Sequence, residues 1–306
     1  MTIRHLKIFV EVAETGKMST AAKNCYISQP TVSQAIHELE EYYGVLLFER
    51  LSKRLYITES GKKLLSYAYQ TLHSFDLLEE AMHNDRMVDR LRIGATITVG
   101  DCLLAEIIAE LQKENPGLEL YSQVGNTRKI QEMLLNSSLD IALVEGTITH
   151  PDLKCIPVVD DFLVLACSPS HPFASREKIC FRDLNDQLFV LREPGSGTRD
   201  LFTRSLQEKD IPIKIACEAN TPQAIRNMVI NNSLLTVISI RLIENEVRQK
   251  KIHIFRNITS GWDRNFYLVT HKDKSFTPAM ELLKTLSMQY KRPEMPDTVS
   301  CGILLP

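Results

Sequence analysis

Hydrophobic positions in the first forty residues repeat with a helical period, in three short segments separated by polar turns. Leu6, Phe9, Val10 and Ala13 lie at positions i, i+3, i+4 and i+7, which predicts an amphipathic helix. A second helix is predicted to be capped at Ser19, and it carries the small residues Ala21 and Ala22, which allow another helix to approach closely. Three such helices can bury one shared core.

The third helix has its own start and stop signals. Ser28 is suited to cap its N-terminus, Pro30 lies in the first turn, where a missing N–H costs nothing, and Gly44 ends it. At about 100° per residue, an apolar face lies opposite a polar one. The apolar face consists of Val32, Ala35, Ile36 and Leu39, and the polar face of Ser33, Gln34, His37 and Glu41. A helix-turn-helix with a free polar face fits DNA reading better than catalysis.

A hairpin with a basic tip is predicted directly after this helix. Residues 45–58, VLLFERLSKRLYIT, contain two short apolar runs, the pattern of a wing beside a DNA groove. The basic residues suited to phosphate contacts are Arg50, Lys53 and Arg54. Phosphate contacts supply affinity, whereas polar side chains of the third helix would reach base edges in the major groove. Each of these residues alone is also typical of ordinary solvated surface, and only the joint pattern favours DNA binding.

A long ungapped block resembles the winged helix-turn-helix of the LysR-type transcriptional regulators. The block is LKIFVEVAETGKMSTAAKNCYISQPTVSQAIHELEEYYGVLLFERLSKRLYITESGKKLL, with SQPTVSQAIHELE and LFER in the positions expected for that family. The resemblance implies that the DNA face consists of Gln29, Pro30, Thr31, Ser33, Gln34 and His37, with Arg50 and Arg54 in the wing. His37 is a departure, because many relatives have arginine there and a histidine is mostly neutral at cytoplasmic pH.

Charge supports DNA binding only weakly. Residues 1–64 contain nine Lys and Arg against seven Asp and Glu, a net charge of +2, whereas the whole chain carries −2. The asymmetry predicts salt-dependent binding with a lower non-specific affinity than that of a strongly basic protein.

A long helix is predicted to follow, capped by Thr58. Its apolar stripe contains Leu64, Ala68, Thr71, Phe75, Leu78 and Met82, widened by Leu65 and Leu72. Periodicity alone fits a helix packed on its own domain as well as a helix packed on a partner. The family resemblance favours the partner, and it implies a homodimer, commonly paired into a homotetramer, on double-stranded DNA with an inverted-repeat-like site.

The composition is that of an ordinary soluble protein of two or three domains, with 306 residues, 44% hydrophobic and 24% charged. We expect a cytoplasmic protein without a membrane partner, because there is no signal sequence and no apolar run long enough to cross a bilayer. The seven cysteines show neither a CxxC pair nor zinc spacing. This predicts reduced thiols, no structural metal and no cofactor.

From Asp89 onward, strand-like runs alternate with helical ones, which predicts an α/β fold. The resemblance implies a two-lobed, periplasmic-binding-protein-like effector domain, so the fold class is α/β multidomain with a mainly helical N-terminal part. The predicted divisions are residues 1–58 for the winged helix-turn-helix, 59–88 for the linker and dimerisation helix, and 89–306 for the effector domain. Lobe I is expected at about 89–165 and 266–292, and lobe II at about 166–265. The tail after Lys291 is predicted to be irregular.

Two segments of this region have the chemistry to hold a small ligand. The first offers the hydroxyls of Thr96 and Thr98 where a strand ends and a helix begins. The second is REPGSGTR, residues 192–199, whose glycines permit close approach and whose Ser196 and Thr198 supply donors. Taken singly, each is more often a helix cap than a binding site.

The resemblance makes both segments, GATITVGDCLL and REPGSGTR, face an effector cleft. The implied effector-binding residues are Thr96, Thr98, Gly100, Asn126, Glu145, Gly146, Gly197 and Thr198, with Gly125 also lining the cleft. Hydroxyls and N–H groups at helix starts suit a small anionic effector, and they are equally compatible with a carboxylate, a phosphate ester and a sulfur oxyanion. The main prediction is therefore a transcriptional regulator whose cleft-bound anion repositions its DNA-binding heads.

Two other classes of function, an enzyme and a redox sensor, are the alternatives to a regulator. An enzyme acting on a small acid lacks support, because the chain has no nucleophile elbow, GxGxxG, Walker lysine or HExxH, and no catalytic residue is predicted. A thiol redox sensor is the second alternative. It would use Cys102 at a helix start, where a thiolate is favoured, with Cys217 or Cys167 as a resolving partner, although the spacing singles out no pair.

Overall fold

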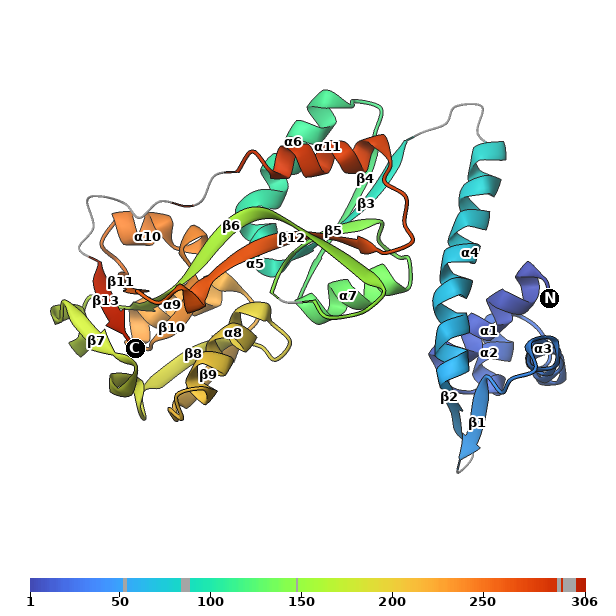
Figure 1. Cartoon of the computed structure of the whole chain (residues 1–306), viewed down its shortest axis with the longest axis horizontal. Coiled ribbons are helices and arrows are strands. Elements are labelled where there is room, and N and C mark those ends of the chain that lie inside the picture. The colour runs from blue at the N-terminus through green and yellow to red at the C-terminus, as the bar shows by residue number, and fades with distance from the viewer. Residues whose placement is uncertain (52–53, 84–88, 147, 291–292, 294–300) are drawn as a thin grey trace. The chain divides into compact units, whose positions relative to one another are not determined.

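The computed structural model describes residues 1–51, 54–83, 89–146, 148–290, 293 and 301–306 (Figure 1). The chain divides into two compact units, one comprising Met1–Val88 with Leu135–Ser137 and the other Asp89–Leu134 with Ser138–Pro306. In the part of the chain so described, no helix is both long and apolar enough to cross a membrane.

Three helices form the core of the first unit: α1 (Ile3–Thr15), α2 (Met18–Asn24) and α3 (Gln29–Tyr43). The start and stop signals of α3 are confirmed, since the Ser28 hydroxyl accepts a hydrogen bond from the Thr31 N–H at 3.3 Å and Gly44 ends the helix with a φ of 67°. The start of α2 was predicted wrongly. Its N-cap is Lys17, which makes no side-chain capping bond, and Ser19 lies inside the first turn.

The hairpin predicted after α3 is confirmed, with β1 (Phe48–Leu51) antiparallel to β2 (Arg54–Ile57). Leu51 pairs with Arg54 across the tip. Lys53 lies outside the described residues, as do the side chains of Arg50 and Arg54, so their phosphate contacts stay a prediction.

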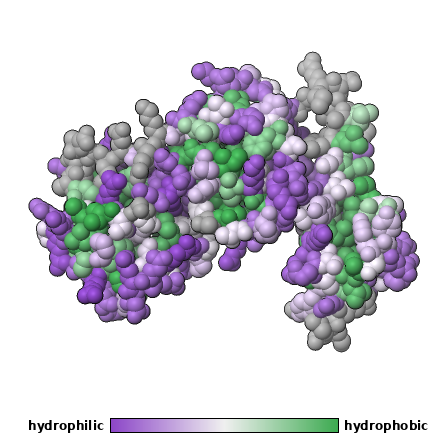
Figure 2. Space-filling model, viewed as in Figure 1, coloured by the Kyte–Doolittle hydropathy of each residue, from purple (hydrophilic) through white to green (hydrophobic). Residues whose placement is uncertain are grey.

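The long helix α4 (Glu59–His83) follows the hairpin, and the Thr58 hydroxyl caps it by accepting from the Gly61 N–H at 3.0 Å. Its apolar stripe divides in two. The first half, with Leu64, Ala68 and Leu72, packs on the core of its own unit. In the second half, Leu78 and Met82 are exposed, Met82 with 76% of its surface accessible, and apolar side chains are visible along this helix in Figure 2. Packing on its own domain is therefore confirmed for the first half of the helix, and packing of the second half on a partner stays a prediction.

The first lobe of the second unit is a sheet with helices on both faces. Its strand order is β4 (Glu119–Gly125), β3 (Arg90–Thr96), β5 (Ile141–Glu145), β12 (Asp263–His271) and the first part of β6 (Leu153–Cys167). Side chains alternate between the faces of β5. Leu143 packs with α6 (Ala105–Glu114) and α11 (Pro278–Ser287), and Val144 packs with α7 (Thr127–Leu135). A helical run precedes α6, formed by α5 (Ile97–Val99) and a π-helical segment, Gly100–Leu104.

The second lobe is built on the remainder of β6. Two strands are antiparallel to β6: β10 (Thr236–Ser239) and β11 (His253–Asn257). The sheet continues from β11 through β13 (Gly302–Leu305) to β7 (Lys178–Cys180). A separate parallel pair is formed by β8 (Leu188–Arg192) and β9 (Lys214–Ala219). Its α-helices are α8 (Gly197–Gln207), α9 (Pro222–Asn232) and α10 (Glu244–Arg248). Helices α8 and α9 pack on opposite faces, because alternate side chains of β6 belong to different core clusters.

Two strands carry the chain between the lobes. β6 pairs with β12 up to Phe162 and with β10 from Leu163 onward. The chain therefore passes from the first lobe to the second at this point, a few residues before the expected boundary at about 165. The expectation of an irregular tail was wrong for its last residues. Gly302–Leu305 form β13 between β11 and β7, because Leu304 completes the core of the second lobe and is fully buried.

Candidate functional site

The DNA-facing residues expected on α3 lie on one exposed side of the helix. Gln29, Pro30, Thr31, Gln34 and His37 are exposed, and Ser33 is half-buried. The opposite face, with Val32, Ala35, Ile36 and Leu39, is buried in the core of the unit. The arrangement leaves a polar helix surface without a tertiary packing role.

Two of these polar side chains are held by acidic neighbours on the same helix. The Gln34 amide donates to Glu38 at 2.9 Å, and the His37 imidazole lies 3.4 Å from the Glu41 carboxylate. Both contacts are exposed i,i+4 pairs, which contribute only a few tenths of a kcal/mol, on the order of 0.2–0.5. A DNA base or phosphate can therefore displace them at little cost.

In the second unit, three of the predicted effector-binding residues form one buried cluster. The hydroxyls of Thr96 and Thr98 donate to the two carboxylate oxygens of Glu145, the second at 2.8 Å, and the Glu145 N–H donates to the Thr96 hydroxyl at 3.1 Å. All three residues are at most 1% exposed. The hydroxyls that were expected to hold an external anion thus hold a carboxylate of the protein itself.

A second buried cluster surrounds the point where β6 and β12 pass between the lobes. The Arg264 guanidinium donates to the fully buried Asp161 carboxylate at 2.8 Å and to the Thr198 hydroxyl at 2.9 Å. The Ser239 hydroxyl donates to the other oxygen of Asp161 at 2.7 Å. Arg264 therefore ties the start of α8 to the crossing strands. Its Nη2 is buried and has no hydrogen-bond partner among the described residues.

A cavity of about 230 Å³ lies between the lobes beside Arg264. Its walls come from both lobes and from β12: Thr127, Gly146, Gly197, Asp200, Leu201, Arg204, Asp263, Arg264, Asn265 and Tyr267. The lobes meet closely at its edge. A Cβ on Gly146, whose φ is +95°, would stand 2.9 Å from the Gly197 Cα, so this approach requires glycine.

Helix α8 begins at this cavity without a side-chain cap. Ser196 is its N-cap residue, yet its hydroxyl makes no capping bond, is buried and has no partner within the described part of the chain. The first N–H groups of a helix need acceptors and carry partial positive charge. The uncapped start of an 11-residue helix and Arg264, whose buried Nη2 has no partner among the described residues, therefore meet at one cavity.

The remaining predicted effector residues have other local roles. Asn126 accepts from the Lys129 N–H at 2.9 Å and so caps α7. Gly100 lies in the π-helical segment, where a Cβ would stand 2.8 Å from the Val124 side chain. Gly125 lies at the end of β4, beside Lys129. Only Gly146 and Gly197 of the predicted set line the cavity.

Arg264 and Asp161 were missed by sequence reasoning. They are 103 residues apart in the chain, and neither belongs to a glycine-rich or helix-start motif. The only local signal is that each lies within or next to an apolar strand, where a charged residue is unusual. That signal marks burial without identifying the partner.

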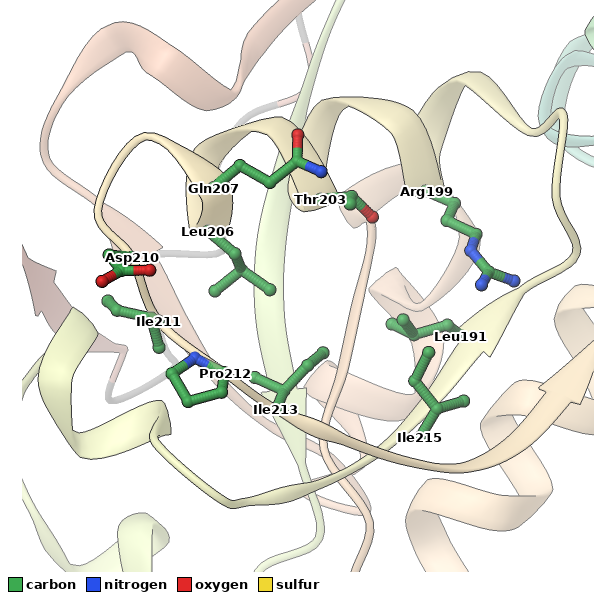
Figure 3. Close-up of a pocket in the computed structure, with 10 residues that line it drawn as sticks. All are labelled: Leu191, Arg199, Thr203, Leu206, Gln207, Asp210, Ile211, Pro212, Ile213 and Ile215. Carbon is green, nitrogen blue, oxygen red and sulfur yellow. The ribbon is translucent and has the colours of Figure 1, made fainter.

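A second, more open groove of about 470 Å³ lies within lobe II alone, between α8 and β9 (Figure 3). Leu206, Ile211, Ile213 and Ile215 supply its apolar wall, and Arg199 stands at one end. The Arg199 guanidinium is already engaged by Glu218 at 2.6 Å and by the Arg192 carbonyl at 2.9 Å. Its charge is therefore compensated.

The cysteines give the redox alternative little support. All seven are free. Cys102 was expected at a helix start, but it lies within the π-helical segment. Burial, reinforced by the nearby Asp161 carboxylate, raises the pKa of its thiol, and burial raises the pKa of Cys167 to about 12. Because the thiolate is the reactive form, both thiols are poorly suited to react with an oxidant.

Known proteins match both units. Residues 3–62 match the bacterial regulatory helix-turn-helix proteins of the lysR family, and residues 84–290 match the LysR substrate binding domain. CysL, an HTH-type transcriptional regulator of Bacillus subtilis, is 30% identical over 281 residues, covering 91% of this chain and 92% of CysL.

Solved structures share the fold. A full-length OxyR variant from Pseudomonas aeruginosa has a TM-score of 0.65 at 23% identity and covers 94% of this chain and 95% of its own. The regulatory domain of Synechocystis PCC6803 CcmR, solved in complex with 2-PG, has a TM-score of 0.60 at 23% identity, covering 66% of this chain and 96% of that domain.

The chain belongs to the LysR family of bacterial transcriptional regulators. It combines the family's helix-turn-helix with its effector-binding domain, which confirms the predicted family and fold class. The family consists of DNA-binding regulators of transcription rather than enzymes.

Proposed function

We propose that this regulator binds a small anionic effector in the cavity beside Arg264, and that effector binding changes the geometry of the lobes and so repositions the DNA-binding heads. One observation carries the proposal: Arg264 lines a cavity walled by both lobes, and its buried Nη2 has no partner among the described residues. A buried donor without an acceptor costs about 1–3 kcal/mol, which an anion would relieve.

The two arginines that line the cavity are balanced by two aspartates, so support for a negatively charged ligand comes from other features of the site. The uncapped start of α8 adds N–H donors and a partial positive charge at the same cavity. The CcmR regulatory domain, similar to this chain in fold, was solved with 2-PG. A ligand held by Arg264 would act on Thr198 and Asp161 at once, because the same guanidinium binds both. Because the bonds of Arg264 depend on how the lobes are arranged, the ligand's contacts would differ between lobe arrangements. Such a difference is the condition under which ligand binding shifts the conformation.

On the DNA side, we propose that Ser33, Gln34 and His37 contact base edges or phosphates and that Arg50, Lys53 and Arg54 contact phosphates. The exposed second half of α4, with Leu78 and Met82, supports pairing with a second copy of the chain. Such a homodimer, or a homotetramer made from two of them, would present two recognition helices to an inverted-repeat-like site.

A thermal-shift screen tests the effector site. Wild-type protein is titrated with small carboxylates, phosphate esters and sulfur oxyanions, and each compound that raises Tm is tested on Arg264→Gln and on Arg248→Gln. Arg248 is an exposed arginine on α10 and serves as the matched control. We expect the Tm rise to persist in Arg248→Gln and to disappear in Arg264→Gln. An undiminished rise in Arg264→Gln would place the effector elsewhere.

The same compounds are then added to DNA-binding assays. We expect a compound that binds through Arg264 to change the footprint or the affinity of the wild-type protein on its operator and to leave Arg264→Gln unaffected. A ligand that binds without altering either property in the wild type would contradict the coupling.

A further inference from the structure

The Glu145 carboxylate occupies the position that the sequence had suggested for an external anion. Each of its oxygens accepts a hydrogen bond from a threonine, one from Thr96 and the other from Thr98 at 2.8 Å. The backbone N–H of Glu145 also donates to the Thr96 hydroxyl at 3.1 Å. Thr96 therefore holds both the backbone and the side chain of Glu145. Two hydroxyls would bind a free carboxylate in the same way, with one donor for each oxygen. Here the carboxylate belongs to the protein chain itself.

The cluster is isolated from solvent and lies where the lobes meet. Thr96 is 0% exposed, and Thr98 and Glu145 are each 1% exposed. Glu145 ends β5 directly before Gly146, and its carbonyl oxygen lies only 2.8 Å from where a Cβ on Gly197 of lobe II would stand. A carboxylate kept out of water is costly unless its oxygens accept hydrogen bonds, and the two threonines satisfy this requirement.

We propose that Glu145 is a tethered anion, whose carboxylate fills the Thr96–Thr98 hydroxyl pair and excludes external carboxylates and oxyanions from it. Exclusion has two causes, since the donors are already taken and a second negative group beside Glu145 would be repelled. Glu145 thereby acts as a specificity residue that leaves Arg264 as the place for an effector's anionic group. Only this last consequence rests on the proposed function; occupancy of the hydroxyl pair by Glu145 stands apart from it.

Chemical rescue tests the tethered anion. Glu145→Ala removes a methylene and a carboxylate, so free acetate matches the deleted group in size and charge. Tm is measured in sodium acetate and in sodium chloride at equal ionic strength for the wild type, Glu145→Ala and Glu218→Ala. Glu218 is a half-exposed carboxylate on β9 and controls for the change in net charge.

We expect acetate to raise the Tm of Glu145→Ala above its value in chloride, by on the order of 3 °C for each tenfold rise above the acetate dissociation constant. The wild type and Glu218→Ala should show no difference between the salts. Adding Thr98→Val to Glu145→Ala should abolish the acetate effect, because one of the two hydroxyl donors is lost. A role of Glu145 in packing alone would not produce this dependence on Thr98.

Equal Tm values of Glu145→Ala in acetate and chloride would overturn the proposal, as would an acetate effect of the same size in the wild type. If Glu145→Ala is insoluble, it is refolded from denaturant in each salt. A higher yield in acetate supports the tethered anion, and equal yields, including none in either, contradict it. The rescue does not involve Arg264, so its failure is distinguishable from failure of the effector screen.

Discussion

Helix α3 and the region where the two lobes meet use similar polar side chains in opposite surroundings. On α3, Gln34 and His37 are exposed and their partners lie four residues away on the same helix. Where the lobes meet, Thr96 and Glu145 are 49 residues apart, Arg264 and Asp161 are 103 residues apart, and all four side chains are largely or fully buried. The α3 surface is therefore determined locally, while the buried clusters between the lobes form only when distant strands meet.

The two regions should differ accordingly in what a substitution costs. An exposed hydrogen-bonded or ionic pair contributes little to the free energy of unfolding, because water competes for both partners. Breaking a buried pair leaves a charge or a donor without a partner in a medium that cannot solvate it. Four variants, one of them a double substitution, test this contrast and are given from the largest expected effect to the smallest.

Arg264→Met should destabilise the protein most, by about 3–5 kcal/mol, because the buried Asp161 carboxylate loses its 2.8 Å partner and keeps only the longer ion pair with Arg241, at 3.8 Å. Urea denaturation measures the loss. The control is Arg248→Met, which breaks an exposed pair with Glu244 and should change stability by at most about 0.5 kcal/mol. Losses of equal size would show that Ser239 and the other neighbours satisfy Asp161 without Arg264.

Ser33→Ala combined with Gln34→Ala should weaken specific DNA binding by about 1–3 kcal/mol for each lost base contact. Non-specific binding should remain nearly unchanged, because phosphate contacts do not depend on these side chains. Gel-shift titrations on the operator and on random DNA measure both. The same loss on both DNAs would contradict base reading by these residues.

Ser28→Ala should cost about 1 kcal/mol, because the hydroxyl caps α3 through the Thr31 N–H. Ser19→Ala is its matched control. Ser19 was expected to cap α2 from the sequence, but it lies inside the first turn of that helix. Thermal denaturation should therefore show a clear decrease for Ser28→Ala and little change for Ser19→Ala. The reverse order would restore the original prediction.

Asp183 should contribute the smallest effect, and only at moderate to high pH. Hydrogen bonding from the Cys180 N–H lowers the pKa of this carboxyl, with Arg176 adding to the effect. A carboxyl with a lowered native pKa stabilises the fold above its unfolded pKa of about 3.9 and loses that contribution as pH falls through the native value.

Asp183→Asn should therefore lower Tm at pH 7 and make the acid side of the Tm profile shallower. The exposed Glu208→Gln is the control for the loss of one negative charge. A profile for Asp183→Asn that runs parallel to that of the wild type down to about pH 3 would remove Asp183 from the acid response.

Local elements were largely predictable because their signals are short in sequence. Ser28 and Gly44 mark both ends of α3, and the apolar step pattern identifies its buried face. The strand of residues 302–305 was missed for the opposite reason. Its partners β11 and β7 lie far back in the chain, and prolines earlier in the tail dominate the local pattern.

The candidate effector site shows the same limit. Sequence reasoning selected Thr96, Thr98 and Glu145 separately as ligand contacts, and the structure joins them to one another. Hydroxyls at the end of a strand look the same in sequence whether they bind a ligand or a side chain from elsewhere in the chain. Arg264, whose Nη2 has no partner among the described residues, gave only the weak local signal of a charged residue within an apolar strand.

By itself, the sequence determined the family, the exposed polar face of α3 and the alternation of helices and strands, since helical and strand periods are properties of neighbouring residues. Only the tertiary structure decided which polar groups are satisfied internally and which remain available. Hydrogen-bond satisfaction depends on the positions of groups 47 to 103 residues apart, and those positions are fixed by the packing of two lobes. For that reason Thr96 and Thr98 donate to Glu145 in the structure, while the Nη2 of Arg264 has no hydrogen-bond partner among the described residues.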